Sequence, residues 1–208
     1  MSRTGEQENL WRVFCAVELP EGVRERAAAY AARLRESATQ VRATWDKPEK
    51  MHVTLKFLGE ITPERVAHLQ AAATRAASGM SPFALAIEGT GAFHTRGRPH
   101  VLWLGVRDDA GQLAGLHHRL EEEAAREKFP RESKKFHPHL TLARLRAPEG
   151  ARALAEEHRA SEFSSESFRI AELLVIRSEL GTGGARHSTL SRHPLRGVGT
   201  SAAQSSEI

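Results

Sequence analysis

Residues 50–60 read KMHVTLKFLGE, and residues 136–146 read FHPHLTLARLR. Both stretches carry histidine, any residue, threonine and leucine inside an apolar run, at 52–55 and at 139–142. In a β-strand, residues two apart point to the same face. Each His/Thr pair is therefore expected on one face of a strand, with the aliphatic residues on the other. The repeat predicts two such strands that face each other across a cleft.

Chance is a poor explanation of this repeat. With a composition that includes 11 histidines, a His-x-Thr-aliphatic sequence is expected only ~0.1 times in a chain of this length. The alternative is that both histidines are satisfied core residues on strands, and a single copy would favour it. Two matched pairs favour a shared site.

Length and charge set the class of protein. The 208 residues could form one domain or two small, closely packed lobes. Hydrophobic residues make up 40% of the chain, which is enough for a core. The formal net charge of +4 suits an anionic partner such as RNA, although solvated surface charge is the commoner cause of such a balance.

Cysteine content and hydropathy indicate the compartment. The single cysteine, Cys15, lies in the apolar run WRVFCAVEL, where we expect it to be buried rather than reactive. It rules out an internal disulfide and fits a reducing compartment. No stretch is long enough to span a membrane, and the polar opening MSRTGEQEN does not resemble a signal peptide. We therefore expect a soluble, cytoplasmic protein.

Apolar runs alternate with Ala/Glu/Arg-rich segments of helical period, which indicates an α+β fold. Strands are expected at 12–19, 52–59, 83–89, 100–106 and 139–145, followed by a hairpin of 167–180 and 186–195. Helices are expected at 20–37, 62–78, 108–128 and 148–161. Residues 11–196 would form a single bilobal domain, and residues 1–10 and 197–208 would be flexible tails.

The segments MHVTLKFLGE and HPHLTLAR, with HVLWLGV between them, resemble the two-histidine (2H) phosphoesterase superfamily. Within it they are most similar to the RNA 2′,3′-cyclic phosphodiesterase family, also described as 2′-5′ RNA ligase-like. The resemblance extends from about Trp11 to Leu195. It implies a bilobal α+β fold with two antiparallel sheets, related by a pseudo-twofold axis around a central cleft, and helices on the outer faces.

Opening a 2′,3′-cyclic phosphate requires a base for water, an acid for the leaving ribose oxygen, and donors for the phosphoryl oxygens. Imidazole titrates near pH 6.5, so one histidine can be neutral while the other is cationic. Two such groups on opposite sides of phosphorus suit an in-line displacement. This scheme needs neither a metal nor another cofactor.

The resemblance implies roles for five residues. His52 would be the proton donor to the 3′ oxygen and His139 the proton acceptor that activates water, leaving a 2′-phosphomonoester. The sequence by itself does not separate acid from base, because the two motifs look equivalent. Thr54 and Thr141 would bind the substrate phosphate. Arg144 lies where the family often carries a phosphate-contacting arginine, although a solvated charge at the strand end is the alternative.

Other residues are weaker candidates. Phe14 and Phe93 are candidates for base or backbone contacts, with core packing as the alternative. Lys56 has the same strand parity as His52, so it would face the cleft or lie at a strand edge. His187 and His193 lie in the last strand, where the family commonly has aromatic residues, and this departure puts the shape of that cleft wall in doubt.

Three alternatives to the metal-independent hydrolase follow from the same residues. A metal site is disfavoured because His117 and His118 are adjacent on a helix and because HExxH and CxxC motifs are lacking. The cleft could instead perform 2′-5′ RNA ligation. It could also belong to a non-catalytic RNA- or nucleotide-binding protein, although pure binding does not need two imidazoles. The expected partner is RNA with a 2′,3′-cyclic phosphate end, with nucleotides as further candidates, and the expected state is a monomer.

Overall fold

We describe the protein from a computed structural model that covers residues 9–147, 149–181 and 184–197. The first half of the chain contains β1 (Trp11–Glu18), α1 (Glu21–Ser37), β2 (Ala43–Trp45), the 3-10 turn η1 (Pro48–Lys50), β3 (His52–Ile61), α2 (Pro63–Ser78), β4 (Phe83–Thr95) and β5 (Arg98–Arg107). The second half contains α3 (Gln112–Arg126), β6 (His139–Leu145), α4 (Ala151–Ala160), β7 (Phe168–Ile170), β8 (Glu172–Gly181) and β9 (Gly184–Pro194).

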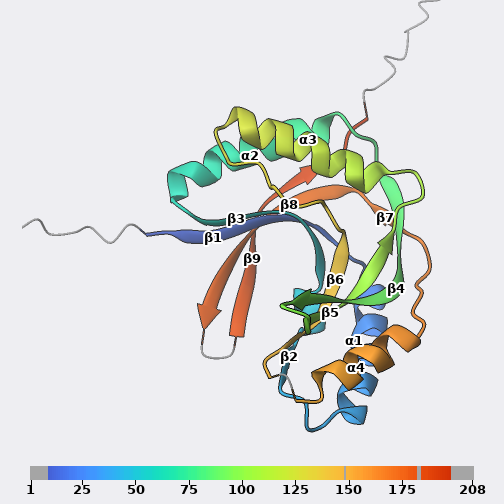
Figure 1. The fold of residues 1–208 in the computed structure, drawn as a ribbon. Helices are drawn as coiled ribbons and strands as arrows, with labels where there is room; N and C mark the ends of the chain where they lie inside the picture. The colour runs from blue at the N-terminus through green and yellow to red at the C-terminus, as the bar shows by residue number, and fades with distance from the viewer. Residues whose placement is uncertain (1–8, 148, 182–183, 198–208) are drawn as a thin grey trace, which may run out of the picture.

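The strands are antiparallel and follow the order β7-β4-β5-β6-β3-β1-β8-β9. Strand β2 lies off this path and pairs with the second half of β6. The two strands that carry the repeated motif, β3 and β6, are neighbours in the middle of the order. Their register contains the pair Val53↔Leu140. The motif strands therefore lie side by side at the centre of the molecule (Figure 1).

The predicted α+β class and its antiparallel strands are confirmed, but the prediction of two separate sheets needs correction. The strands form one hydrogen-bonded path because Val53 and Leu140 bridge its two halves. One half is β7-β4-β5-β6 and the other is β3-β1-β8-β9. Each half ends in its motif strand at the bridge. The pseudo-twofold axis between the halves stays a prediction.

Helices cover the outer faces of the two halves. Helices α2 and α3 pack together over the half that contains β3, β1 and β8, whereas α1 and α4 lie on the half that contains β4, β5 and β6 (Figure 1). The amphipathic pattern of each helix explains its placement. In α2, the buried residues recur at helical spacing on the sheet side: Val66, Leu69, Ala72, Ala73, Ala76 and Ala77. This arrangement leaves the motif face of the sheet free of helices.

A β-bulge follows each motif threonine. Between β1 and β3 the register passes from Ala16↔Thr54 to Cys15↔Lys56, so Leu55 is the extra residue. Between β5 and β6 it passes from Trp103↔Thr141 to Leu102↔Ala143, so the equivalent leucine of the second motif is extra. An extra residue reverses the alternation of side chains along the strand. Each motif strand therefore changes faces just after its threonine.

The bulges correct the prediction for Lys56 and explain the position of Arg144. Lys56 is buried, and its side chain lies on the helix side, where its ammonium donates to Glu121 at 2.7 Å. The residues three after each threonine, Phe57 and Arg144, line the motif face instead. Strict alternation from His52 would have placed Lys56 there.

Most of the two predicted tails lies outside the described residues. Of the segments 1–10 and 197–208, only residues 9, 10 and 197 are described, and they belong to no helix or strand. The tip of the last hairpin, residues 182–183, also lies outside the described residues. None of the described helices is long and apolar enough to cross a membrane.

Candidate active site

The motif face contains a cleft of about 480 Å³. His52 and Thr54 line it from β3, and His139 and Thr141 line it from β6. The remaining walls come from β1, β2, β8, β9, the segment that joins β2 to β3, and Arg146 just after β6. The structure thus brings the four motif residues, which are separated by about ninety positions in sequence, into one cleft.

The two imidazoles are held in the same way. Nδ1 of His52 lies 2.6 Å from the carbonyl oxygen of Lys50, and Nδ1 of His139 lies 2.7 Å from that of His137. A carbonyl oxygen only accepts, so Nδ1 carries a hydrogen in both histidines. In the neutral ring, Nε2 is then left as the acceptor, and in the cation it becomes a second donor. The backbone therefore fixes both tautomers with Nε2 available for acid–base chemistry.

A phenylalanine lies against each motif histidine. The Phe14 ring stacks on His52 with centroids 4.7 Å apart, and Phe93 meets His139 edge-on at 4.8 Å. Phe14 is 4% exposed and lines the cleft, whereas Phe93 packs among His137, His139 and Trp103. Both rings limit the orientations that the imidazoles can adopt.

Burial lowers the pKa of both motif histidines. Loss of hydration is the largest cause for His52, and the nearby His187 adds to it, so that the pKa of His52 falls to about 4. Burial is also the main reason that the pKa of His139 lies below its ordinary value, and the hydrogen bond to the His137 carbonyl opposes the shift. At neutral pH the free site therefore presents two neutral imidazoles.

The cleft carries an excess of positive charge. Its lining contains one carboxylate, Asp46, and five cationic side chains: Arg12, Lys47, Lys50, Arg144 and Arg146. Nη1 of Arg144 donates to Asp46 at 3.1 Å. Burial raises the pKa of Asp46, and Arg144 opposes the shift. A surface of this charge attracts an anion such as a phosphoryl group.

Sequence reasoning missed several of these residues. Lys50 lines the cleft from the end of the 3-10 turn η1, outside the strand, so alternation from His52 gave no signal for it. Asp46 and Arg12 gave no signal, because they reach the cleft from separate segments. The sequence marked His187 only as a departure from the aromatic residues that the family commonly has in its last strand. In the structure, the ring centroids of His187 and His52 lie 5.3 Å apart. His193 does not join the cleft: it is buried and contacts Thr74 at 2.9 Å.

Two further predictions concern the single cysteine and a possible metal site. Cys15 is fully buried, as predicted, and this burial raises the pKa of its thiol to about 12. Among the residues that the structure describes, no group of three or more His, Cys, Asp or Glu side chains is arranged to hold a metal ion.

The sequence matches known proteins over most of its length. The model of the family "LigT like Phosphoesterase" matches it twice, at residues 17–103 and 104–187, and each match contains one motif. The RNA 2′,3′-cyclic phosphodiesterase of Thermus thermophilus is 36% identical over 197 residues, covering 89% of this chain and 91% of the relative. The Escherichia coli protein of the same name is 29% identical over 192 residues, covering 88% and 96%.

Solved structures agree with these matches. The crystal structure of E. coli LigT complexed with 3′-AMP superposes with a TM-score of 0.70 at 28% identity, covering 90% of this chain and 99% of that one. The match includes both halves of the sheet. The chain therefore belongs to the LigT-like phosphoesterase family of 2H phosphoesterases.

Proposed function

We propose that the protein is an RNA 2′,3′-cyclic phosphodiesterase that hydrolyses cyclic phosphate ends to 2′-phosphomonoesters without a metal. The observation that carries this proposal is the pair of imidazoles with matched tautomers in one cationic cleft. The names of the Thermus and E. coli relatives agree with it. We further propose that it acts as a cytoplasmic monomer, and both of these remain predictions from the sequence.

In the proposed reaction, Nε2 of His139 accepts a proton from water, and the hydroxide attacks phosphorus. The bond from phosphorus to the 3′ oxygen breaks, and Nε2–H of His52 gives its proton to that oxygen. The phosphate stays on the 2′ oxygen. In-line displacement requires attacking and leaving oxygens on opposite sides of phosphorus, so two separated imidazoles suit it. The assignment of acid and base rests on the family resemblance.

A proton donor must be protonated, whereas the pKa of His52 in the free protein is about 4. We propose that the bound substrate raises the pKa of His52. A phosphate monoanion roughly 4 Å away contributes about 4 kcal/mol at an effective dielectric constant of about 20. That energy corresponds to raising the pKa by about three, which returns His52 to the neutral range. His52 would therefore become an acid only when the anion is bound.

The remaining polar residues would hold the phosphoryl group. Thr54 and Thr141 share the cleft face with the histidines, and their hydroxyls can donate to non-bridging oxygens. The Arg144 guanidinium can bind a phosphate oxygen pair while Asp46 orients it. Phe14 and Phe93 would hold the imidazoles in place, and contact with a base stays a prediction.

The site is also proposed to admit a nucleotide. E. coli LigT has been crystallised with 3′-AMP and with ATP, and its structure matches this chain over 90% of its length. A mononucleotide with a cyclic phosphate would therefore serve as a minimal substrate.

The test is a product analysis with EDTA present. An RNA that ends in a 2′,3′-cyclic phosphate is incubated with the wild type, with His52→Ala, with His139→Ala and with His118→Ala. His118 is an exposed histidine of α3 and serves as the matched control. We expect a 2′-phosphate from the wild type and the control, and a loss of at least about a hundredfold in each cleft variant.

Other products contradict particular parts of the proposal. A 3′-phosphate would refute the assignment of the 3′ oxygen as leaving group. Activity that disappears with EDTA and returns with a divalent metal would refute metal independence. Equal activity of the wild type and both cleft variants would refute catalysis by the two histidines.

A further inference from the structure

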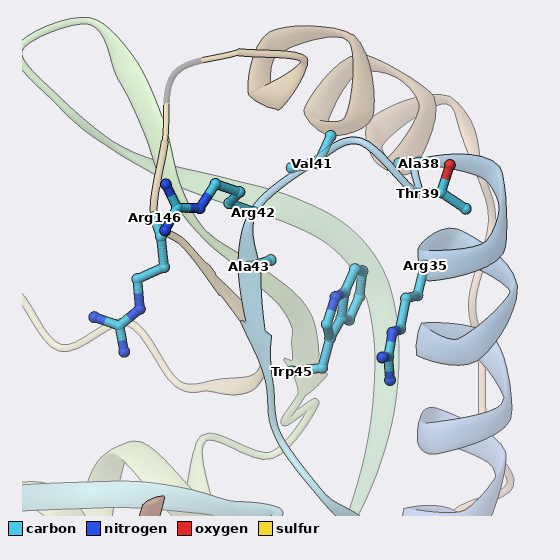
Figure 2. Close-up of a pocket in the computed structure, with 8 residues that line it drawn as sticks. All are labelled: Arg35, Ala38, Thr39, Val41, Arg42, Ala43, Trp45 and Arg146. Atoms are coloured by element: carbon cyan, nitrogen blue, oxygen red, sulfur yellow. The ribbon is translucent and has the colours of Figure 1, made fainter.

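A second hollow adjoins the catalytic cleft along β2. It has a volume of about 530 Å³, and Arg35, Arg42 and Arg146 line it together with Trp45 (Figure 2). Trp45 and Arg146 also line the catalytic cleft, so the two hollows are neighbours. None of the described residues that line the second hollow is acidic. Cationic side chains therefore extend beyond the catalytic cleft into the neighbouring hollow.

The pairing of β2 with β6 aligns the arginines. Thr44 pairs with Arg144, and one step further the backbone N–H of Arg146 donates to the carbonyl of Arg42 at 2.7 Å. Arg146 follows the last residue of β6 and continues its pairing with the chain before β2, so Arg146 and Arg144, two positions apart, share a face. Figure 2 shows the side chains of Arg42 and Arg146 on one side of β2, with Trp45 on the other side. Arg144 is followed by Arg146, and Arg42 lies across from Arg146 on the paired segment, so the three residues form a cationic row that leads away from His139.

The outer members of this row are available to a ligand. In the part of the chain that the structure describes, Arg144 forms an ion pair with Asp46, whereas Arg42 and Arg146 form none. Arg146 instead donates through Nε to the Thr44 hydroxyl at 3.0 Å, which leaves both of its terminal nitrogens free to bind. Binding an anion here breaks no existing ion pair.

We propose that this row binds the backbone phosphates of the RNA strand on the 5′ side of the cyclic phosphate. This inference rests on the proposed function. Alternate residues of a strand are roughly 6.6 Å apart, close to the separation of successive phosphates in an extended nucleotide chain. Contacts of this kind position a strand without reading its sequence. The row therefore selects oligonucleotide over mononucleotide substrates.

The experiment compares two substrates on two matched variants. The substrates are 2′,3′-cyclic AMP, which fills only the catalytic cleft, and a hexaribonucleotide with the same end. The variants are Arg42→Glu and Arg126→Glu, which change the net charge equally. Arg126 is exposed on α3, on the outer face of the other half. Neither residue belongs to the proposed acid–base machinery.

We expect Arg42→Glu to lower kcat/KM roughly tenfold on the hexanucleotide, through KM, and to leave 2′,3′-cyclic AMP unchanged. Arg126→Glu should change kcat/KM on either substrate by no more than about twofold. For Arg42→Ala, the slope of log kcat/KM against log salt on the hexanucleotide should shrink by about 0.7, the value for one lost contact on a single strand.

Two results would overturn the inference. The first is that Arg42→Glu keeps the wild-type preference for the hexanucleotide over 2′,3′-cyclic AMP. The second is that Arg42→Glu and Arg126→Glu lose kcat/KM on the hexanucleotide equally. If the wild type hydrolyses neither substrate, the proposed function fails by itself. Fluorescence anisotropy with the same RNA then decides about the row: weaker binding by Arg42→Glu than by Arg126→Glu supports it, and equal binding refutes it.

Discussion

Val53 of β3 pairs with Leu140 of β6, and this pair sets the geometry of the cleft. In antiparallel register, the residues on either side of the pair place His52 across from Thr141, and Thr54 across from His139. The two histidines then lie on a diagonal, for which attachment points are roughly 7–8 Å apart. Such a separation leaves room for a phosphoryl group between the imidazoles. Each motif thus supplies the threonine that faces the other motif's histidine.

The pKa of His52 depends on the charge of its neighbours as well as on burial. His187→Gln removes a neighbouring positive charge and leaves the burial of His52 largely intact. We expect the titration midpoint of His52 in the free protein, followed by NMR, to move upward from about 4 but to stay below the ordinary value near 6.5. His118→Gln should leave the midpoint in place. A downward movement would contradict this electrostatic account.

The same titration tests the proposed action of the substrate. An unreactive phosphate anion in the cleft should raise the midpoint of His52, because the anion favours the imidazolium. As an acid, His52 supports catalysis below its pKa in the complex, and kcat should fall as pH rises through that pKa. If saturating phosphate leaves the midpoint near 4, His52 cannot be the acid at neutral pH.

Arg144→Ala should weaken substrate binding. Loss of a charge-assisted contact to phosphate is expected to raise KM roughly tenfold, with a smaller effect on kcat. Asp46→Asn should act in the opposite direction on inorganic phosphate and lower its inhibition constant a few-fold, because the carboxylate then no longer neutralises Arg144. Steady-state kinetics measure both values, with Arg126→Ala as control. An unchanged KM in Arg144→Ala would show that Arg144 does not contribute to binding of the substrate phosphate.

The buried pair of Lys56 and Glu121 should matter for stability rather than catalysis. Their side chains are only 3% and 7% exposed, and the Lys56 ammonium also donates to the Pro130 carbonyl at 2.8 Å. Lys56→Met leaves Glu121 as an unpaired buried charge, and we expect the free energy of unfolding in urea to fall by about 3–5 kcal/mol. The double variant with Glu121→Leu should recover most of this loss. A fall in kcat without a loss of stability would contradict this and indicate that Lys56 acts in the cleft.

Cys15 should be inert in the folded protein. Its burial removes access, and a thiol whose pKa is about 12 stays protonated at pH 8. An aromatic disulfide reagent should therefore label it fully in urea and hardly at all in native buffer. Rapid stoichiometric labelling of the native protein would show that β1 opens readily.

The residues of the site differ in how far the sequence reveals them. His52, Thr54, His139 and Thr141 are visible because a matched pattern recurs inside two apolar runs. Alternation of side chains along a strand predicted that each pair shares a face, and the pairing of β3 with β6 brings both pairs into one cleft. The pattern also pointed to the family, and through it to the α+β fold.

Two features lay beyond such reasoning. Lys56 leaves the cleft because a bulge follows Thr54, and a bulge is a matter of cross-strand register. The bulge after Thr141 likewise turns Arg144 to the cleft face, a position that the family resemblance implied and strand alternation did not. Strand β2 has only three residues, too few to show alternation, and yet it contributes to both hollows.

The sequence by itself determined the chemistry of this protein: two imidazoles and two hydroxyls on strands, in a chain with a basic surplus. Residue type and local period are properties of short segments, so they can be read without a fold. Only the tertiary structure decided which charges surround those groups. Asp46 binds Arg144, His187 approaches His52 and Arg42 extends the cationic row, because strands distant in sequence pair and bring them together.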